Sequence, residues 1–144
     1  MKKIILLMTL MSASITFSQW NPDTGQNLLV ANGTASIIAA EGTSTGETYV
    51  VYWKQVGAPV NYELRMQILD VDGNRTLGDE GMLISADLSM ATYTVLSTAK
   101  VDAADNIYIA VTATDGVNSV YAYKFDSSGN ELWRSNAPIG FGNK

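Results

Sequence analysis

Residues 125–133, FDSSGNELW, repeat the pattern of residues 69–77, LDVDGNRTL, and this repeat decides the fold. Aligned at one constant offset, the stretches match Asp70 with Asp126, Gly73 with Gly129, Asn74 with Asn130 and Leu77 with Trp133. A Gly-Asn pair after a small polar residue suits a hairpin turn, in which Gly takes a positive φ and Asp bonds to the turn backbone. We therefore expect a tight turn between two strands in each copy.

The repeat continues upstream, where TYVVYW (48–53) overlays IYIAVT (107–112) with Tyr49 on Tyr108, at a slightly larger offset. Runs of Val, Ile, Thr and Tyr separated by Gly, Asn, Asp and Ser are typical of short strands joined by tight turns. The clearest such runs are residues 48–56, 62–70, 106–114 and 119–126. No segment after the N-terminal apolar run shows a sustained helical period, so the sequence predicts an all-β protein.

Each copy is predicted to contain four strands, the last one short. A four-stranded unit of about 40–60 residues, repeated in tandem, is the sequence form of a β-propeller blade. The expected fold is thus a set of propeller-type four-stranded antiparallel repeats, about two blades of an incomplete propeller, with an open β-sandwich as the alternative. The expected bounds are 1–18 for a signal peptide, 19–35 for an N-terminal segment with an outer strand, 36–90 for the first repeat and 91–144 for the second.

Residues 101–133, VDAADNIYIAVTATDGVNSVYAYKFDSSGNELW, resemble the SBBP-type bacterial β-propeller repeat. The matching positions are Asp102, Asn106, Tyr108, Lys124, Asp126, Gly129 and Trp133. The chain departs from the family pattern in having Asp105 where Gly is usual and Val111 at or near a second usual Gly. The resemblance implies a secreted protein of Bacteroidetes-type bacteria, and the shared motifs are structural rather than catalytic.

The N-terminus resembles an export signal. Lys2 and Lys3 precede an apolar run over residues 4–11, and SITFSQ supplies small residues for cleavage after Ser18. That run is too short to cross a bilayer, which needs about 20 residues. We therefore expect a secreted protein, in the periplasm, at the cell surface or outside the cell, with no transmembrane segment after the signal.

Charge and composition exclude several classes of function. The chain has 9 basic and 14 acidic residues, and loss of Lys2 and Lys3 would leave 7 against 14, a net charge of −7. Without clustered Lys and Arg we expect no nucleic-acid partner. The chain has no His and no Cys, which excludes Ser-His-Asp and Cys-His catalysis and thiolate or His zinc sites. No phosphate-binding glycine loop occurs, so no cofactor is expected.

The DVDGN stretch also invites a calcium-loop interpretation, with Asp70 and Asp72 as ligands. An EF-hand loop starting at Asp70 would require Gly where Arg75 stands and Glu where Gly81 stands. The second copy replaces Asp72 with Ser128, so the repeat does not demand two carboxylates. The turn interpretation is favoured, and Asp70 and Asp72 remain the metal candidates.

Aromatic residues raise the question of a sugar-binding platform. The candidates are Trp53, Trp133, Tyr52, Tyr62 and Tyr108. Aromatic side chains in strands more often pack between sheets. The carboxylates are spread over turn-like stretches, and no pair is singled out as a tuned acid and base.

The sequence therefore favours a secreted, non-enzymatic β-repeat module with a structural or binding role at the cell envelope or outside the cell. The alternative is a carbohydrate- or protein-binding segment of a larger surface protein, and the third is a glycan-active enzyme on a propeller scaffold. The partners to be expected are further blades, a second copy of the chain, a glycan or a protein.

Overall fold

The computed structural model describes residues 25, 27–57, 61–86, 89–90, 97–114 and 118–135. These residues form strands and no helix, so the predicted all-β class is confirmed. The expected signal peptide, residues 1–18, lies outside the described residues. The strands are β1 (Ala35–Gly42), β2 (Thr48–Val56), β3 (Asn61–Leu69), β4 (Met82–Ser85), β5 (Ser89–Met90), β6 (Ser97–Val101), β7 (Ile107–Thr114), β8 (Asn118–Phe125) and β9 (Glu131–Arg134).

The first sheet is an antiparallel meander in the order β1-β2-β3-β4. Its central pair, β2 and β3, is in continuous register from Thr48 opposite Leu69 to Val56 opposite Asn61. Cross-strand partners share a face of the sheet, so this register puts Tyr49 beside Ile68 and Val51 beside Met66. The four strands are those that the sequence predicts for one repeat.

The second sheet repeats this meander as β6-β7-β8-β9, with β5 as an addition. Both β5 and β6 pair with β7: β5 lies against residues 113–114 and β6 against residues 107–111. The short strand β5 falls within the range expected for the first repeat, yet it joins the second sheet. One repeat therefore contributes a strand to its neighbour's edge.

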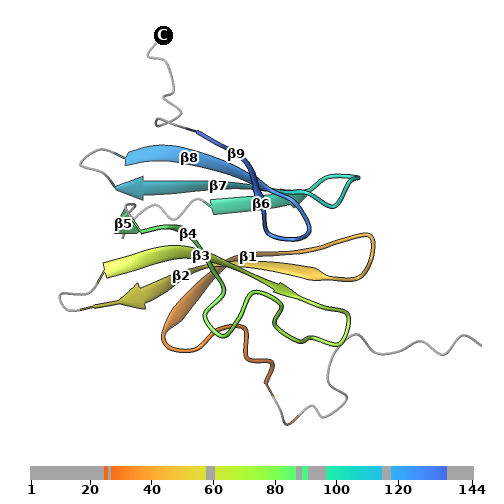
Figure 1. The fold of residues 1–144 in the computed structure, drawn as a ribbon. Helices are drawn as coiled ribbons and strands as arrows, with labels where there is room; N and C mark the ends of the chain where they lie inside the picture. The colour runs from red at the N-terminus through yellow and green to blue at the C-terminus, as the bar shows by residue number, and fades with distance from the viewer. Residues whose placement is uncertain are drawn as a thin grey trace, which may run out of the picture.

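The two sheets stack face to face, with the core between them (Figure 1). Each sheet has an inner face, turned toward the other sheet, and an outer face, turned away from it. The buried core residues of the first sheet are Tyr49, Val51, Trp53, Leu64, Met66, Ile68 and Ile84, and those of the second are Ala99, Ile107, Ile109, Val111, Tyr123 and Phe125.

The stacking is head to tail. In the alignment of the two repeats, residues 49, 51 and 53 of the inner face of the first sheet correspond to residues 108, 110 and 112 on the outer face of the second. Residues 64, 66 and 68 correspond in the same way to residues 120, 122 and 124. In a two-fold sandwich, equivalent faces of the two repeats would pack against each other. Here the inner face of one sheet packs against a non-equivalent face of the other. This arrangement fits an incomplete propeller as well as an open sandwich.

Residues 27–34 cover part of the outer face of the first sheet. Ala31 and Val30 pack with Val50, Tyr52 and Leu69 in a second, smaller core. No strand forms in residues 27–34, where an outer strand is expected, and β1 begins at Ala35. The first sheet is thus covered on both faces, which explains why every residue of the run 49–54 is buried.

Candidate functional site

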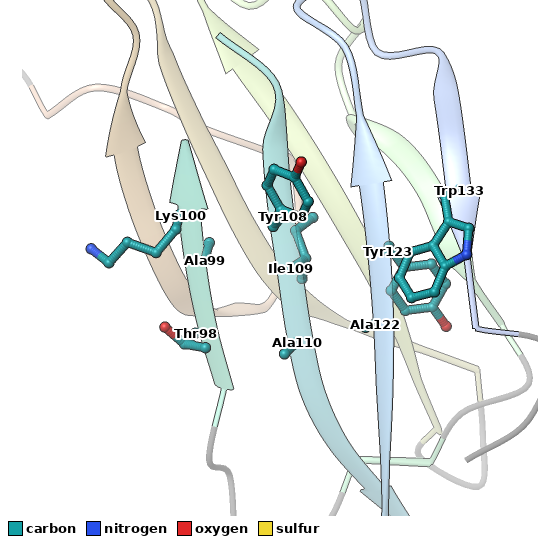
Figure 2. A pocket seen from close by; sticks show the side chains of 9 residues that line it. All are labelled: Thr98, Ala99, Lys100, Tyr108, Ile109, Ala110, Ala122, Tyr123 and Trp133. Atoms are coloured by element: carbon teal, nitrogen blue, oxygen red, sulfur yellow. The ribbon is translucent and has the colours of Figure 1, made fainter. Parts of the chain in front are cut away.

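The outer face of the second sheet combines exposed aromatic rings with a floor of small side chains. The register puts Tyr108 beside Lys124, Ala110 beside Ala122, and Lys124 beside Trp133. A shallow pocket runs between Tyr108 and Trp133 over the two alanines (Figure 2). Tyr108 is 44% exposed and Trp133 is 50% exposed. Exposed aromatic side chains on either side of a flat floor make this face the candidate binding site.

Lys124 supplies a cation to this face. Its Nζ lies 4.6 Å from the centroid of the Tyr108 ring and 3.5 Å from Oδ2 of Asp102. The Tyr108 hydroxyl, and secondarily the Asp102 carboxylate, raise the pKa of Lys124. Lys124 therefore stays charged at neutral pH and holds the Tyr108 ring by a cation–π contact. A flat ligand that stacks on aromatic rings and accepts hydrogen bonds fits such a surface.

The other predicted aromatic candidates lie elsewhere. Trp53 is 1% exposed in the core between the sheets, where no ligand reaches it. Tyr52 is buried on the outer face of the first sheet, where its hydroxyl donates to the main-chain oxygen of Glu80 at 2.5 Å. Tyr62 is partly buried against the core. Of the five candidates, only Tyr108 and Trp133 come together on an exposed face, and Trp53 is a core residue.

Four hairpin turns at one end of the two sheets share a geometry (Figure 1). In each turn the first residue's N–H donates to the fifth residue's carbonyl, and the fourth residue's N–H donates to the first residue's carbonyl. The fourth residue always has a positive φ, from 59° at Asp105 to 94° at Gly46. This is the three-residue hairpin loop that ends in a left-handed residue. The turns are residues 43–47, 70–74, 102–106 and 126–130.

Asp70, the first calcium candidate, is the first residue of such a turn. Its Oδ1 accepts hydrogen bonds from the main-chain N–H of Asp72 at 3.0 Å and of Asn74 at 2.8 Å. The Asn74 side chain donates to Oδ2 at 3.0 Å, and this amide is the main reason that the pKa of Asp70 is lowered. Asp102 and Asp126 accept the same bonds in their own turns. The carboxylate of Asp70 thus holds the turn, and Asp72 contributes its backbone.

We expect Asp70→Ala to lower the midpoint of thermal unfolding by about 2–6 °C, because two turn amides lose their acceptor. Asp72→Ala is the matched control and should leave the midpoint within about 1 °C. Asp72 donates to Asp70 through its main-chain N–H, which alanine retains. Scanning calorimetry with calcium and with a chelator measures both effects. Equal losses in the two variants, together with a calcium-dependent rise in the wild-type midpoint, would favour a metal site instead.

The turn aspartates also make stability depend on pH. Hydrogen bonds from the side chain and backbone of Asn106 lower the pKa of Asp102 to about 2. An unfolded Asp titrates at about 3.9, so the folded state favours the ionised form. The resulting stabilisation is fully present above about pH 4 and is lost as the pH falls through about 2. Urea midpoints should change little between pH 7 and 5 and should fall between pH 4 and 2, less steeply in Asp102→Asn; an equally steep fall in that variant would contradict this assignment.

Asp105 connects the two sheets. The sequence identifies it only as a residue that stands where the SBBP-type repeat usually has Gly. Its φ of 59° is costly for a residue other than Gly, although Asp and Asn tolerate it best. Its carboxylate accepts from the main-chain N–H and the hydroxyl of Ser44, both at 2.7 Å. Its carbonyl accepts from the Tyr49 hydroxyl at 2.7 Å. Asp105 therefore links the turn of the second sheet to the turn and core of the first.

The described residues contain no group of three or more His, Cys, Asp or Glu placed to hold a metal ion. Within the same ranges, no helix is long and apolar enough to span a membrane. Comparison of the chain with protein-family models, with curated proteins and with solved structures found no match. The inference about function therefore depends on the geometry of the outer face of the second sheet and on the sequence.

Proposed function

We propose that the chain is an exported, non-enzymatic β-repeat module with a structural or binding role at the cell envelope or outside the cell. The observation that carries this proposal is the outer face of the second sheet, where Tyr108 and Trp133 stay about half exposed. Large aromatic side chains exposed together on one face commonly mark an interaction surface. The export-like residues 1–18 and the resemblance to SBBP-type repeats of secreted proteins support the same proposal.

The carboxyl groups support a non-enzymatic role. A general acid in glycan hydrolysis needs a raised pKa. The described carboxyl groups with a shifted pKa all have it lowered: Asp70, Glu80, Asp102, Asp126 and Glu131. Each is held by a hydrogen bond from a neighbouring side chain, which stabilises the ionised form. These groups are suited to holding turns and ion pairs rather than to donating a proton.

The second candidate function is carbohydrate binding. Sugar rings stack on aromatic side chains, and Tyr108 and Trp133 flank the pocket over Ala110 and Ala122. Lys124, above the Tyr108 ring, is placed to donate hydrogen bonds to ligand hydroxyl groups. A glycan array probed with the wild-type chain and with Trp133→Ala tests this candidate, because specific binding must be lost in the variant.

Cell fractionation tests the proposed function. The full chain, expressed in a Bacteroidetes-type host, should be exported and cleaved after Ser18, so that the mature protein begins at Gln19. Its association with the envelope or with a partner outside the cell should fall at least about fivefold in Trp133→Ala, since a buried aromatic anchor contributes about 1 kcal/mol or more to an interface. Leu132→Ala is the matched control, because Leu132 lies on the same strand and is 52% exposed. Retention of the unprocessed chain in the cytoplasm, or the same distribution for both variants, would contradict the proposal.

A further inference from the structure

The outer face of the second sheet is the repeat-related counterpart of a face that is already buried. Tyr108 corresponds to Tyr49, and Ala122 corresponds to Met66. Tyr49 and Met66 are fully buried against the second sheet, whereas Tyr108 is 44% exposed. In a head-to-tail stack, each unit covers one face of the unit before it and leaves its own equivalent face uncovered. Each added unit therefore extends the series. The interface between the two sheets is therefore a template for what the outer face of the second sheet binds.

The first feature of this template is a tyrosine hydrogen bond. The Tyr49 hydroxyl reaches across the interface and donates to the carbonyl of Asp105, the fourth residue of a turn in the second sheet. Burial, together with the negative charges of Glu47 and Asp105, raises the pKa of Tyr49 to about 12, so the hydroxyl remains a donor. Tyr108 stands at the same position of the second repeat.

The second feature is a side chain that packs on a turn glycine. The two Cδ atoms of Leu77 lie 3.2 and 3.7 Å from the place that a Cβ would take on Gly129 of the second sheet. Leu28, in the segment before β1, makes the same contact with Gly73 of the first sheet, also at 3.2 and 3.7 Å. Each layer thus covers the turn glycine of the next layer. Trp133 occupies the position of Leu77 in the second repeat and is half exposed.

We propose that the outer face of the second sheet binds a further four-stranded antiparallel β repeat, stacked head to tail. This inference rests on the proposed binding role and names the class of partner. In the complex, the Tyr108 hydroxyl donates to the main-chain carbonyl of the fourth residue in a D-x-x-[G/D]-N turn of the added repeat. Trp133 packs on the glycine of that repeat's second turn.

A second copy of this chain fits the face less well. In a head-to-tail contact it would have to present the outer face of its first sheet, and Val50, Tyr52 and Leu69 on that face are already buried by residues 30–31. The same face carries the ion pair of Lys54 with Glu80, at 2.5 Å. The occupant is therefore a repeat with a free apolar face, like the inner face of the second sheet.

The test extends the full chain at its C-terminal end, through a Gly/Ser linker, with one more copy of its residues 91–135. A second extended protein carries residues 36–135 instead; without residues 30–31, the side chains of Val50, Tyr52 and Leu69 are uncovered, so its first sheet presents an apolar outer face. In both proteins we expect a single unfolding transition, with a midpoint several degrees above that of the unextended chain. Tyr108→Phe and Trp133→Ala in the original copy should each remove at least half of this gain, while Leu132→Ala keeps it.

Separate melting of the appended part in both proteins, or a gain that survives Tyr108→Phe and Trp133→Ala, would overturn the inference. So would dimerisation of the unextended chain in sedimentation experiments that is lost in Trp133→Ala, because the occupant would then be a second copy. Glycan binding lost in the same variant would also overturn it. The unfolding of the purified extended proteins measures docking and does not depend on export. If docking succeeds but the cell fractionation experiment fails, the proposed role at the envelope is refuted and the docking inference stands.

Discussion

Trp53→Ala is expected to lower the free energy of unfolding by about 3–5 kcal/mol, the range for deleting a large buried aromatic side chain. Trp53 is 1% exposed and packs in the core between the two sheets, so its removal leaves a cavity that both sheets border. Urea unfolding followed by circular dichroism measures the loss.

Trp133→Ala is the matched control, because the side chain is 50% exposed; its effect on the free energy of unfolding should stay within about 0.5 kcal/mol. Trp53→Phe should cost less than about 2 kcal/mol, because the ring that remains fills most of the space. The indole N–H of Trp53 is buried and finds no hydrogen-bond partner among the described residues, so losing it offsets part of the lost packing. Similar losses for Trp53→Ala and Trp133→Ala would contradict the assignment of Trp53 to the core.

These two tryptophans show what the sequence can and cannot predict. Both lie in strands with similar neighbours, and composition makes both candidates for one aromatic platform. Their burial differs because the inner face of the first sheet is covered by the second sheet, whereas Trp133 lies on an outer face. Which face receives a second layer is a tertiary property, and the strand sequence does not encode it locally.

The strands and the D-x-x-[G/D]-N turns were predictable because their determinants are local. Asp70, Asp102 and Asp126 bond to amides two and four positions ahead, so a short local stretch of sequence specifies each turn. The run 49–54 was harder to interpret, since it is buried on both faces and shows no alternation. Its outer face is covered by residues 30–31, a contact between segments that no periodicity reveals.

The loop over residues 78–81 was also beyond the reach of sequence reasoning. The side chain of Gln67 donates to the carbonyl of Gly78 at 2.7 Å, and Lys54 pairs with Glu80 at 2.5 Å. A lysine and a glutamine in the middle of strands would suggest a face in contact with water, yet both are buried under this loop. Their polar groups are satisfied by main-chain and side-chain atoms distant along the chain, and the sequence does not disclose the path of the loop.

Gly81→Ala is expected to lower the free energy of unfolding by about 2–5 kcal/mol, with strain and overpacking acting together. Gly81 has a φ of 66°, which costs a residue with a Cβ about 1–2 kcal/mol. Its Cβ would also stand 2.6 Å from the carbonyl oxygen of Met66 and closer still to the Tyr52 hydroxyl. The backbone of β3 cannot move away without breaking its pairing.

Gly78→Ala separates the two causes. Gly78 lies in the same loop with a φ of 76°, but nothing stands within 4 Å of its would-be Cβ, so this variant should lose only about 1–2 kcal/mol. Tyr52→Phe in the Gly81→Ala background should recover part of the difference, because it removes the hydroxyl that the new methyl group meets. Urea denaturation of the two single variants, of Tyr52→Phe and of the double variant completes the cycle. Equal losses of stability at Gly78 and Gly81 would mean that backbone strain alone requires glycine at both positions. A larger loss at Gly81 is expected from the direct contact of the loop with β3, where the loop covers the outer face of the first sheet.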